Sequence, residues 1–341
     1  MKEVLLVGNF LSEATGVRSV CEDLAGQLAA SGWRIITTSN KLNRVARLKD
    51  MVQVAWGQRY HYGVAQVDVY SGPAFLWAEV VCWVLRWANK PYVLTLHGGN
   101  LPAFAQRWPG RVRRLLRSAV AVTTPSRYLL EKLHSFGNDL QLLPNPLDLS
   151  HYPFRLRSEP QPRLVWLRAF HHLYNPRLAI QVLAQLAPKL PTVHLFMVGP
   201  DKGDGSFQAT QRLAAALGVQ ERVTWPGGVT KSAVPAWLNK GDIFINTSTA
   251  DNAPVSVVEA MACGLCVVST NVGGIPYLLS DGVEALLVPS DSPVDMSDAV
   301  GRLLAEPGLA AACSRQAKFK SEQWDWAAIL PQWERLLLSV Q

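Results

Sequence analysis

The alternation of apolar runs with amphipathic stretches along the chain predicts strands separated by helices. Near the N-terminus the run VLLVGNF predicts a strand, and the next segment has helical apolar spacing at Val20, Leu24 and Leu28 before it stops at Gly32. Further strands are expected in RIITTS, YVLTLHGG, AVAVTTPS and LQLLPN, each of which ends in polar or small residues. Strands that alternate with helices predict a parallel sheet covered by helices on both faces.

The second half of the chain repeats this plan. Strands are expected in RLVWLRAF, HLFMVGP, RVTWPGG and DIFINTS, with helices between them in PRLAIQVLAQLAPKL, QATQRLAAALG and AVPAWLNKG. Between the halves, residues 148–163 contain three prolines and no periodicity, so we place a linker there. The fold class predicted is therefore α/β, with two doubly wound, Rossmann-like domains that face each other across a cleft.

One stretch in the second half, NTSTADNAPVSVVEAMACGLCVVSTNVGGIPYLL, places two carboxylates eight residues apart. The Asn-Ala-Pro break at 252–254 favours a helix start, because Asn is a good cap and Pro is tolerated in the first turn. We expect a helix over residues 255–263, followed by a short buried strand in CVVST. Asp251 should therefore lie in the loop before the helix and Glu259 within it.

The ends of the expected strands are the places to look for a ligand, because doubly wound sheets bind ligands outside the carboxyl ends of their strands. Candidates there include His97, Arg168 and Gly199. The glycines after the first strand are only Gly8 and Gly16, which do not form the G-x-G-x-x-G pattern of dinucleotide binding. A nicotinamide enzyme is therefore not predicted.

Composition narrows the class of protein. The 341 residues are 49% hydrophobic and 17% charged, which indicates a folded protein with room for two domains. Five cysteines, an odd number, are typical of reduced thiols, and the CxxC of Cys263 and Cys266 has no second pair or nearby His to complete a zinc set. The longest apolar stretch, residues 74–88, includes Glu79 and Arg86 and predicts a core helix. We expect a cytoplasmic protein without a metal.

The net positive charge lies entirely in the first half. Residues 1–150 hold 17 Lys and Arg against 10 Asp and Glu, whereas residues 151–341 hold 16 of each. Much of the excess lies between Arg107 and Arg117, beside Trp108. On a helix this segment would give either a surface that rests on anionic lipid or a solvated basic face, and the sequence leaves both readings open. No nucleic-acid-binding module accompanies the charge, so nucleic acid is not an expected partner.

The chain resembles the retaining glycosyltransferases of family 4, the glycosyltransferase group 1 type, which have the two-domain GT-B fold. That family shows a carboxylate, seven residues and a Glu in an EAMACG-like helix, followed by a VVST-like strand and two glycines. Here the pattern reads DNAPVSVVEAMACGLCVVSTNVGG, and the pieces TGVRSV, LTLHGG, TTPSRYLLEKL and LPNPLDLSHY precede it in the family's order. The resemblance implies an acceptor-binding domain over 1–150, a donor-binding domain over 151–322, and a terminal helix over 323–341 that packs back on the first domain.

The resemblance also implies roles for individual residues. Arg168 matches a phosphate-binding arginine, Glu259 a glutamate that accepts hydrogen bonds from the donor's ribose, and Asp251 a carboxylate at the donor sugar. His97 matches a residue that contacts the same sugar, and Gly16 a glycine whose backbone approaches the phosphates. The other expected donor-binding residues are Asn252, Ala253, Pro254, Val255, Gly199, Tyr174 and Asn175.

Two departures from the family pattern bear on function. The family usually has Glu where this chain has Asp251, and commonly has a Lys about five residues after the arginine, where this chain has Leu173, Tyr174 and Asn175. Tyr174 or Asn175 could replace the lysine with a neutral hydrogen bond, or a protonated His171 or His172 could do so. Alternatively, the missing lysine indicates an unusual donor or an inactive site.

These observations and the resemblance lead to one functional prediction, in which retention and the acceptor class come from the resemblance alone. We expect an enzyme that transfers a hexose-type sugar, with retention, from a nucleotide-diphosphate donor to a hydroxyl of a lipid-linked or growing cell-surface saccharide, without a cofactor. It would act at the inner membrane face if Arg107–Arg117 rests on lipid. The alternatives are a non-catalytic protein that binds nucleotide sugars and a sugar-nucleotide epimerase of the same architecture.

Overall fold

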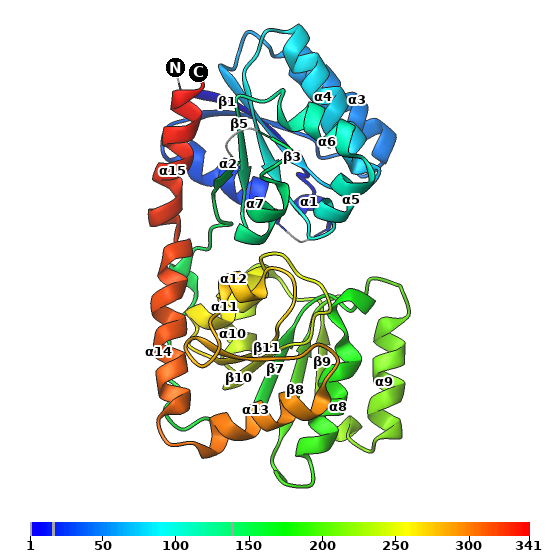
Figure 1. The fold of residues 1–341 in the computed structure, drawn as a ribbon, viewed down its shortest axis with the longest axis vertical. Coiled ribbons are helices and arrows are strands. Elements are labelled where there is room, and N and C mark those ends of the chain that lie inside the picture. The colour runs from blue at the N-terminus through cyan, green and yellow to red at the C-terminus, as the bar shows by residue number, and fades with distance from the viewer. Residues whose placement is uncertain (1, 16–17, 138–139) are drawn as a thin grey trace. The chain divides into compact units, whose positions relative to one another are not determined.

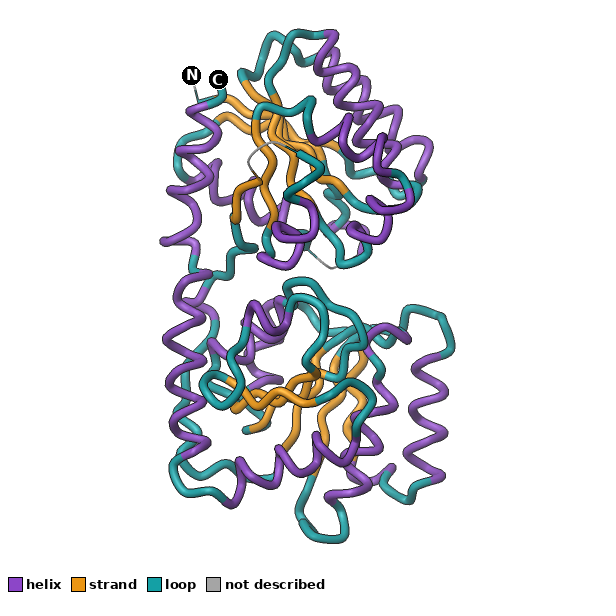
Figure 2. Tube along the Cα trace, viewed as in Figure 1, coloured by secondary structure: helices purple, strands orange, loops and turns teal. Residues whose placement is uncertain are grey.

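The computed structural model describes residues 2–15, 18–137 and 140–341, which form two compact units (Figure 1). Unit 1 comprises Met1–Pro146 and Trp326–Gln341, and unit 2 comprises Leu147–Asp325. Each unit is a parallel sheet with helices packed on it, as the tube view shows (Figure 2). The predicted fold class, two doubly wound Rossmann-like domains, is confirmed.

Unit 1 has a sheet of strand order β2-β1-β3-β4-β5-β6, in which all recorded pairings are parallel. The strands are β1 Glu3–Val7, β2 Arg34–Thr38, β3 Val64–Val69, β4 Tyr92–Leu96, β5 Ala121–Thr124 and β6 Leu140–Leu142. The helices are α1 Ser12–Thr15, α2 Val20–Ala30, α3 Arg44–Gly57, α4 Ala74–Trp87, α5 Leu101–Arg107, α6 Pro109–Leu116, α7 Arg127–Leu133 and α15 Trp326–Ser339. The chain order reverses between β1 and β3, which makes this the topological switch point of the sheet.

Unit 2 has the strand order β12-β11-β10-β7-β8-β9, again with parallel pairings. Its strands are β7 Arg163–Leu167, β8 His194–Val198, β9 Val223–Gly227, β10 Ile243–Asn246, β11 Cys266–Thr270 and β12 Ala285–Val288. Its helices are α8 Pro176–Leu186, α9 Ser206–Ala216, α10 Val234–Leu238, α11 Val255–Ala262, α12 Ile275–Leu278, α13 Pro293–Ala305 and α14 Leu309–Ser321. The switch point of this sheet lies between β7 and β10.

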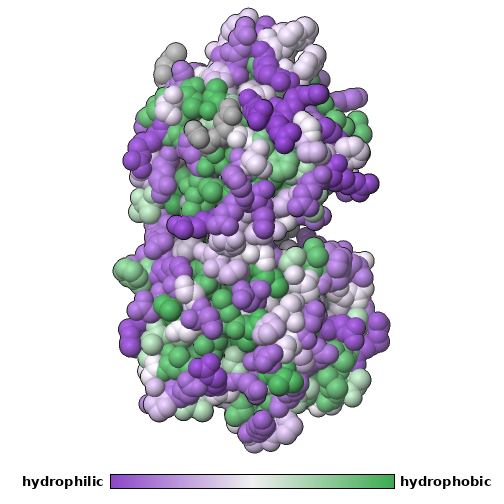
Figure 3. Space-filling model, in the orientation of Figure 1, coloured by the Kyte–Doolittle hydropathy of each residue, from purple (hydrophilic) through white to green (hydrophobic). Residues whose placement is uncertain are grey.

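The cores follow from strands that are buried on both faces. In β1, Val4, Leu5 and Leu6 are completely buried, and β4 and β11 are buried along their whole length. Such continuous apolar runs are characteristic of parallel strands covered by helices on both sides. Away from the cores, hydrophilic and hydrophobic residues alternate over the visible surface of each unit (Figure 3).

Two parts of unit 1 differ from the sequence-based expectation. β3 was not expected, because Gln66 and Asp68 interrupt its apolar pattern, yet it is a central strand. The basic segment Arg107–Arg117 forms the end of α5 and the whole of α6, separated at Trp108, because Pro109 begins a new helix. None of the described helices, α4 included, is long and apolar enough to cross a membrane.

Candidate functional site

The candidate site of unit 2 lies at its topological switch point. Arg168 follows β7 directly, and its backbone N–H donates to the carbonyl of Val198 on β8 (3.0 Å). The loop after β10 runs from Thr247 to Pro254 and leads into α11. The carboxyl ends of β7 and β10 therefore bring Arg168 and this loop to the part of the sheet where ligands bind in open α/β folds.

The guanidinium of Arg168 is nearly buried and forms an ion pair with a carboxylate. Its Nη2 contacts Oδ2 of Asp251, and the charge lies 4.6 Å from the centre of the Tyr174 ring. Burial lowers the pKa of Arg168, although Tyr174 and Glu259 act in the opposite direction. An arginine guanidinium stays protonated in proteins, so Arg168 carries its positive charge.

The Asp251 carboxylate is fixed by its own loop. Oδ1 accepts a hydrogen bond from the backbone N–H of Asn252 (2.9 Å), and Oδ2 accepts one from Ser248 Oγ (3.1 Å). The backbone N–H of Gly274, in the loop after β11, donates a hydrogen bond to the backbone carbonyl of Asp251 (2.8 Å). A Cβ on Gly274 would lie 1.7 Å from the carbonyl oxygen of Asn252, so only glycine permits this close support.

Glu259 is buried on α11, where two residues that the sequence did not suggest hold its carboxylate. Oε1 accepts hydrogen bonds from the hydroxyl of Tyr152 and from Nζ of Lys231, both at 2.7 Å. Lys231 follows β9, and the two glycines at the end of RVTWPGG mark the end of that strand. This strand end is the sequence signal that could have identified Lys231 as a candidate. Tyr152 ends the LPNPLDLSHY segment, but it lies 107 residues from Glu259 in the sequence, and no local pattern connects the two residues.

Several buried polar atoms around the start of α11 lack a hydrogen-bond partner among the described residues. They are Nε of Arg168, Oδ1 of Asn252 and Oγ of Ser256. A buried polar atom without a partner costs about 1–3 kcal/mol, so such atoms rarely gather without a reason. The free amides of a helix start, together with these donors and acceptors, suit a polar, anionic ligand.

Not all of the expected donor-binding residues face this site. Asn175 has a left-handed backbone, and its side-chain amide donates to Oδ1 of Asp291 (2.5 Å). Gly199 packs against β7, where a Cβ would lie 1.7 Å from the carbonyl oxygen of Arg168. Sheet packing is therefore sufficient to explain this glycine. The remaining expected residues follow Asp251 in order: Asn252, Ala253 and Pro254 in the loop and Val255 at the start of α11.

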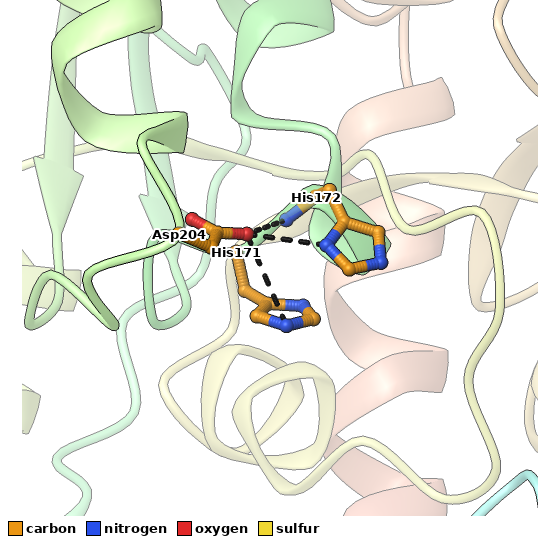
Figure 4. Close-up of side chains that lie close together, drawn as sticks. All are labelled: His171, His172 and Asp204. Carbon is orange, nitrogen blue, oxygen red and sulfur yellow. Dashed lines mark hydrogen bonds and ion pairs between the residues drawn. The ribbon is translucent and has the colours of Figure 1, made fainter.

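The histidines considered as substitutes for the missing lysine lie beside Asp204 (Figure 4). Nδ1 of His172 is 3.2 Å and Nε2 of His171 is 3.9 Å from Oδ2 of Asp204, and within the described chain these are the three side chains grouped closely enough to hold a metal ion. Asp204 also accepts hydrogen bonds from the backbone N–H groups of His172 (2.9 Å) and Ser206 (3.0 Å), which hold its pKa below the usual range. These bonds give Asp204 a structural role at the start of α9.

The CxxC pair is buried and protonated. Burial raises the pKa of Cys263 and of Cys266 to about 12 each, so both are thiols at neutral pH. All five cysteines are free and buried. A metal ligand or redox nucleophile requires a thiolate, so the pair serves the core of unit 2.

His97 follows β4 in unit 1 and is held by the strand that the sequence analysis missed. Its Nε2 lies 3.0 Å from Oδ1 of Asp68, its ring stacks on Tyr70, and Gln66 donates to the same carboxylate oxygen (2.8 Å). The polar residues that hid β3 are therefore those that orient His97. Gly16 lies outside the described residues.

Two family models match adjacent parts of the chain. One, described as Glycosyl transferases group 1, matches residues 152–320, and the other, Glycosyltransferase Family 4, matches residues 59–151. The chain belongs to the group 1 glycosyltransferases. The resemblance to family 4, group 1 type, that was stated from the motifs is thereby confirmed, and the unit 2 site lies within the region that the group 1 model matches.

Individual relatives agree with this family. The D-inositol 3-phosphate glycosyltransferase of Mycobacteroides abscessus is 32% identical over 195 residues, which are 56% of this chain and 42% of that protein. The chain spans about half the length of the curated relatives that it matches.

Solved structures share the fold over the whole chain. Sucrose-phosphate synthase from Thermosynechococcus elongatus has a TM-score of 0.82 at 19% identity and covers 100% of both chains. Anabaena HepE, solved in complex with UDP-glucose, has a TM-score of 0.78 at 18% identity and covers 99% of both chains.

Proposed function

We propose that this protein transfers a hexose-type sugar from a nucleotide-diphosphate donor to a hydroxyl acceptor. The observation that carries the proposal is the arrangement at the start of α11, where the buried cation of Arg168 and unpartnered polar atoms of Asn252 and Ser256 surround a helix N-terminus. The solved relative that holds UDP-glucose has the same fold, and the group 1 family model covers this region.

The chemistry of the donor explains these groups. As the glycosidic bond breaks, the diphosphate leaving group gains negative charge, and a preorganised cation and helix amides stabilise that charge. Arg168 is already desolvated and held beside Asp251, so little reorganisation is needed when the donor binds. We assign the phosphates to Arg168 and the amides of α11, the ribose hydroxyls to Glu259, and the sugar to Asp251.

We propose retention of the anomeric configuration, with the acceptor attacking on the face from which the phosphate leaves. The departing phosphate oxygen would take the acceptor's proton, so no side chain acts as the general base. The Asp251 carboxylate forms an ion pair with Arg168, and we assign it the role of holding the sugar. Arg168 and Lys231 supply positive charge, so we propose that a metal ion is not required.

A direct test is release of nucleotide diphosphate from a panel of UDP-, GDP-, ADP- and TDP-sugars, with the sugar product analysed by NMR. We expect turnover with one nucleotide class, an α-linked product from an α-linked donor, and an unchanged rate in EDTA. Asp251→Asn should abolish transfer while the variant still binds nucleotide. Tight nucleotide binding without turnover of any sugar or acceptor would instead favour the non-catalytic alternative.

We propose saccharides or polyols as the acceptor class. The Mycobacteroides abscessus relative is named for transfer to D-inositol 3-phosphate, a phosphorylated polyol, and lipid-linked saccharides present similar hydroxyls. Incubation with a panel of saccharides and polyols, followed by chromatographic separation of the products, would test this acceptor class. If the protein hydrolyses a donor but transfers its sugar to none of the saccharides and polyols, the proposed acceptor class is wrong.

We further propose that unit 1 rests on an anionic membrane through the surface formed by α4 and α6. Trp83 and Trp87 are 54% and 70% exposed and stack with their centroids 5.4 Å apart. A shallow hollow of about 250 Å³ joins Trp83 and Arg86 of α4 to Arg114 of α6. Exposed tryptophans beside arginines suit the headgroup region of a bilayer with negative charge.

Vesicle sedimentation tests this surface. The protein should bind phosphatidylglycerol vesicles but not pure phosphatidylcholine vesicles. The double variant Arg86→Gln, Arg114→Gln should lose about 2 kcal/mol of membrane-binding free energy, since each basic residue near such a surface contributes about 1 kcal/mol. Phe319→Ser, which changes an exposed aromatic residue of unit 2, is the matched surface control. Equal binding of both vesicle types would overturn the membrane proposal.

A further inference from the structure

Unit 2 contains a cluster of metal-ligating side chains outside the proposed donor site, formed by His171, His172 and Asp204 (Figure 4). The two histidines lie between β7 and α8, and the carboxylate lies in the loop before α9. Asp204 is 32 residues from His172 in the sequence, so no ligand spacing indicated the group, and the sequence analysis expected no metal. The fold therefore assembles a set of ligands that the sequence alone does not show.

Backbone hydrogen bonds and aromatic packing hold these two segments together. The N–H of Phe170 donates to the carbonyl of Pro200 (2.8 Å), and the N–H of Lys202 donates to the carbonyl of Phe170 (3.2 Å). The buried Phe170 ring meets the ring of Phe207, in the first turn of α9, at a centroid distance of 4.7 Å. His171 directly follows Phe170, so the core fixes its place relative to the start of α9.

The turn before α9 brings the Asp204 carboxylate to the histidines. Gly203 and Gly205, on either side of it, have φ angles of +75° and +83°, a left-handed backbone that glycine adopts without strain. Oδ1 accepts a hydrogen bond from the N–H of Ser206 (3.0 Å), and Oδ2 accepts one from the N–H of His172 (2.9 Å). Each carboxylate oxygen has two lone pairs, so Oδ2 has a second one for a partner shared with the His172 ring.

The ligand atoms are spaced as they are around one small metal ion. Oδ2 of Asp204 lies 3.2 Å from Nδ1 of His172 and 3.9 Å from Nε2 of His171, and one ligand atom from each residue lies within 4.8 Å of the others. Zinc binds nitrogen and oxygen at about 2.0–2.2 Å in tetrahedral geometry, so two of its ligands lie roughly 3.4 Å apart. Side-chain rotation therefore suffices to complete the set.

The chemistry of the ligands selects the class of ion. Imidazole nitrogens suit zinc, copper, nickel and iron, whereas magnesium and calcium prefer oxygen ligands. Three protein ligands leave the fourth position of a tetrahedral ion to water, and the His172 side chain is 72% exposed, so solvent reaches it. When Nε2 of His171 binds the ion, the ring proton lies on Nδ1, and the long hydrogen bond from the N–H of Leu173 to Nδ1 (3.3 Å) is lost.

We propose that His171, His172 and Asp204 bind a divalent first-row transition ion, represented by Zn²⁺, with water in the open position. The ion joins the 3₁₀ turn His172–Tyr174 to the start of α9. Two ligands from one segment and a third from another make the site a cross-link within unit 2. Bound ion should therefore stabilise this unit against unfolding.

The site is separate from the transfer reaction. The carbonyl of Tyr174 already accepts a hydrogen bond from Oγ1 of Thr247 (2.6 Å), and the carbonyl of Leu173 accepts one from the N–H of Thr249 (2.9 Å). These bonds hold the turn against the loop after β10 without an ion. The ion should therefore add stability and leave the proposed transfer rate unchanged.

Calorimetric titration of the full chain, without an affinity tag, with ZnCl₂ tests the site. We expect one Zn²⁺ to bind per chain and MgCl₂ to bind at least a hundredfold more weakly. Co²⁺, which replaces Zn²⁺ in such sites, should give the visible absorption of a four-coordinate ion. Zn²⁺ should also raise the temperature of thermal unfolding, by an amount that grows with its concentration.

Variants locate the ion. His171→Gln and Asp204→Asn should each weaken Zn²⁺ binding at least tenfold, since even an outer partner of a metal ligand contributes that much to affinity. The double variant His171→Gln, His172→Gln should lose the thermal shift. His151→Gln is the matched control, because His151 is 64% exposed and lies 3.7 Å from Asp148, yet no third ligand in the described chain completes that pair.

Three results would overturn the site: equal Zn²⁺ affinity in the double variant and the wild-type protein, an equal loss in His151→Gln, or Mg²⁺ binding as tight as that of Zn²⁺. Circular dichroism checks that each variant is folded. These measurements need no sugar donor, and Zn²⁺ affinity should be the same in Arg168→Met as in the wild-type protein. Loss of the ion site would therefore leave the glycosyltransferase proposal standing.

Discussion

At the scale of residues, the proposed donor site combines two cations with two carboxylates from different parts of the chain. Arg168 pairs with Asp251, and Lys231 pairs with Glu259. Where the family commonly has a lysine, this chain has Leu173, Tyr174 and Asn175. We therefore propose that Lys231 partly compensates for the missing positive charge. Lys231 forms an ion pair with Glu259. Its main effect should therefore be to orient the Glu259 carboxylate toward the ribose and to neutralise the negative charge of Glu259 near the diphosphate.

Lys231→Met should therefore weaken binding of the preferred nucleotide diphosphate about tenfold, on the scale of a hydrogen bond to a charged group. The loss should not be larger, because the lysine side chain is 47% exposed and solvent screens its charge. Calorimetric titration measures the change, and Lys189→Met, an exposed lysine of unit 2, is the control. An affinity equal to that of the control would remove Lys231 from the donor site.

At the scale of elements, the sequence predicted what depends on local pattern and missed what depends on contacts between distant segments. The helix after Asp251 was expected over 255–263 and is observed as Val255–Ala262, since its start and its closing glycine are local signals. β3 was missed because Gln66 and Asp68 point to partners on β4 and beyond it, which no local pattern records. For the same reason Tyr152 could not be connected to Glu259.

The close approach of β7 and β8 leads to an element-scale prediction. Gly199→Ala should destabilise unit 2 by about 2–4 kcal/mol, because its Cβ would lie 1.7 Å from the carbonyl oxygen of Arg168 and would displace the strand end that carries the site. Gly301→Ala is the matched control: this glycine lies within α13 with no atom near the new methyl group, so the change should stabilise by about 0.5–1 kcal/mol.

Chemical denaturation of the full chain, followed by tryptophan fluorescence, gives both free energies of unfolding. The expected signs are opposite for the two variants. Should Gly199→Ala be as stable as the wild-type protein, β8 would not approach β7 as closely as described, and the steric explanation of Gly199 would be wrong.

At the scale of the whole molecule, the two ends of the chain complete the same unit. The terminal helix α15 buries Trp326, Trp333 and Leu337 in a cluster with residues of β1 and α2. Its Glu334 accepts hydrogen bonds from Nε1 of Trp33 (2.9 Å) and from Lys2 Nζ (3.1 Å), which connect the helix to the N-terminal segment. Unit 1 is therefore assembled from segments at opposite ends of the sequence.

This contact predicts a pH dependence for unit 1. The hydrogen bonds from Trp33, then Lys2 and Ser31, hold the pKa of Glu334 below its ordinary value of 4.5. A carboxyl group whose pKa is lower in the folded state stabilises the fold above its unfolded pKa, and this contribution is lost as pH falls through the folded pKa. The stability of unit 1 should therefore decline below about pH 4.5, by less in Glu334→Gln than in the wild-type protein.

Thermal unfolding between pH 3 and 7 measures this difference. Glu306→Gln, which changes an exposed carboxylate of unit 2, should retain the wild-type slope for the unit 1 transition. Identical pH profiles for Glu334→Gln and the wild-type protein would show that the hydrogen bonds from Trp33 and Lys2 to Glu334 do not stabilise unit 1.

The central claim, a nucleotide-diphosphate donor site at the start of α11, is tested most directly by calorimetric titration with UDP, GDP, ADP and TDP. We expect one nucleotide to bind the wild-type protein, and Arg168→Met to weaken it about a hundredfold or more, comparable to removal of one donor from an oxyanion site. Glu259→Gln should weaken it as well, while Arg177→Met, an exposed arginine of α8, should not. Absence of binding by any of the four at millimolar concentration, or equal affinity in Arg168→Met, would contradict the account.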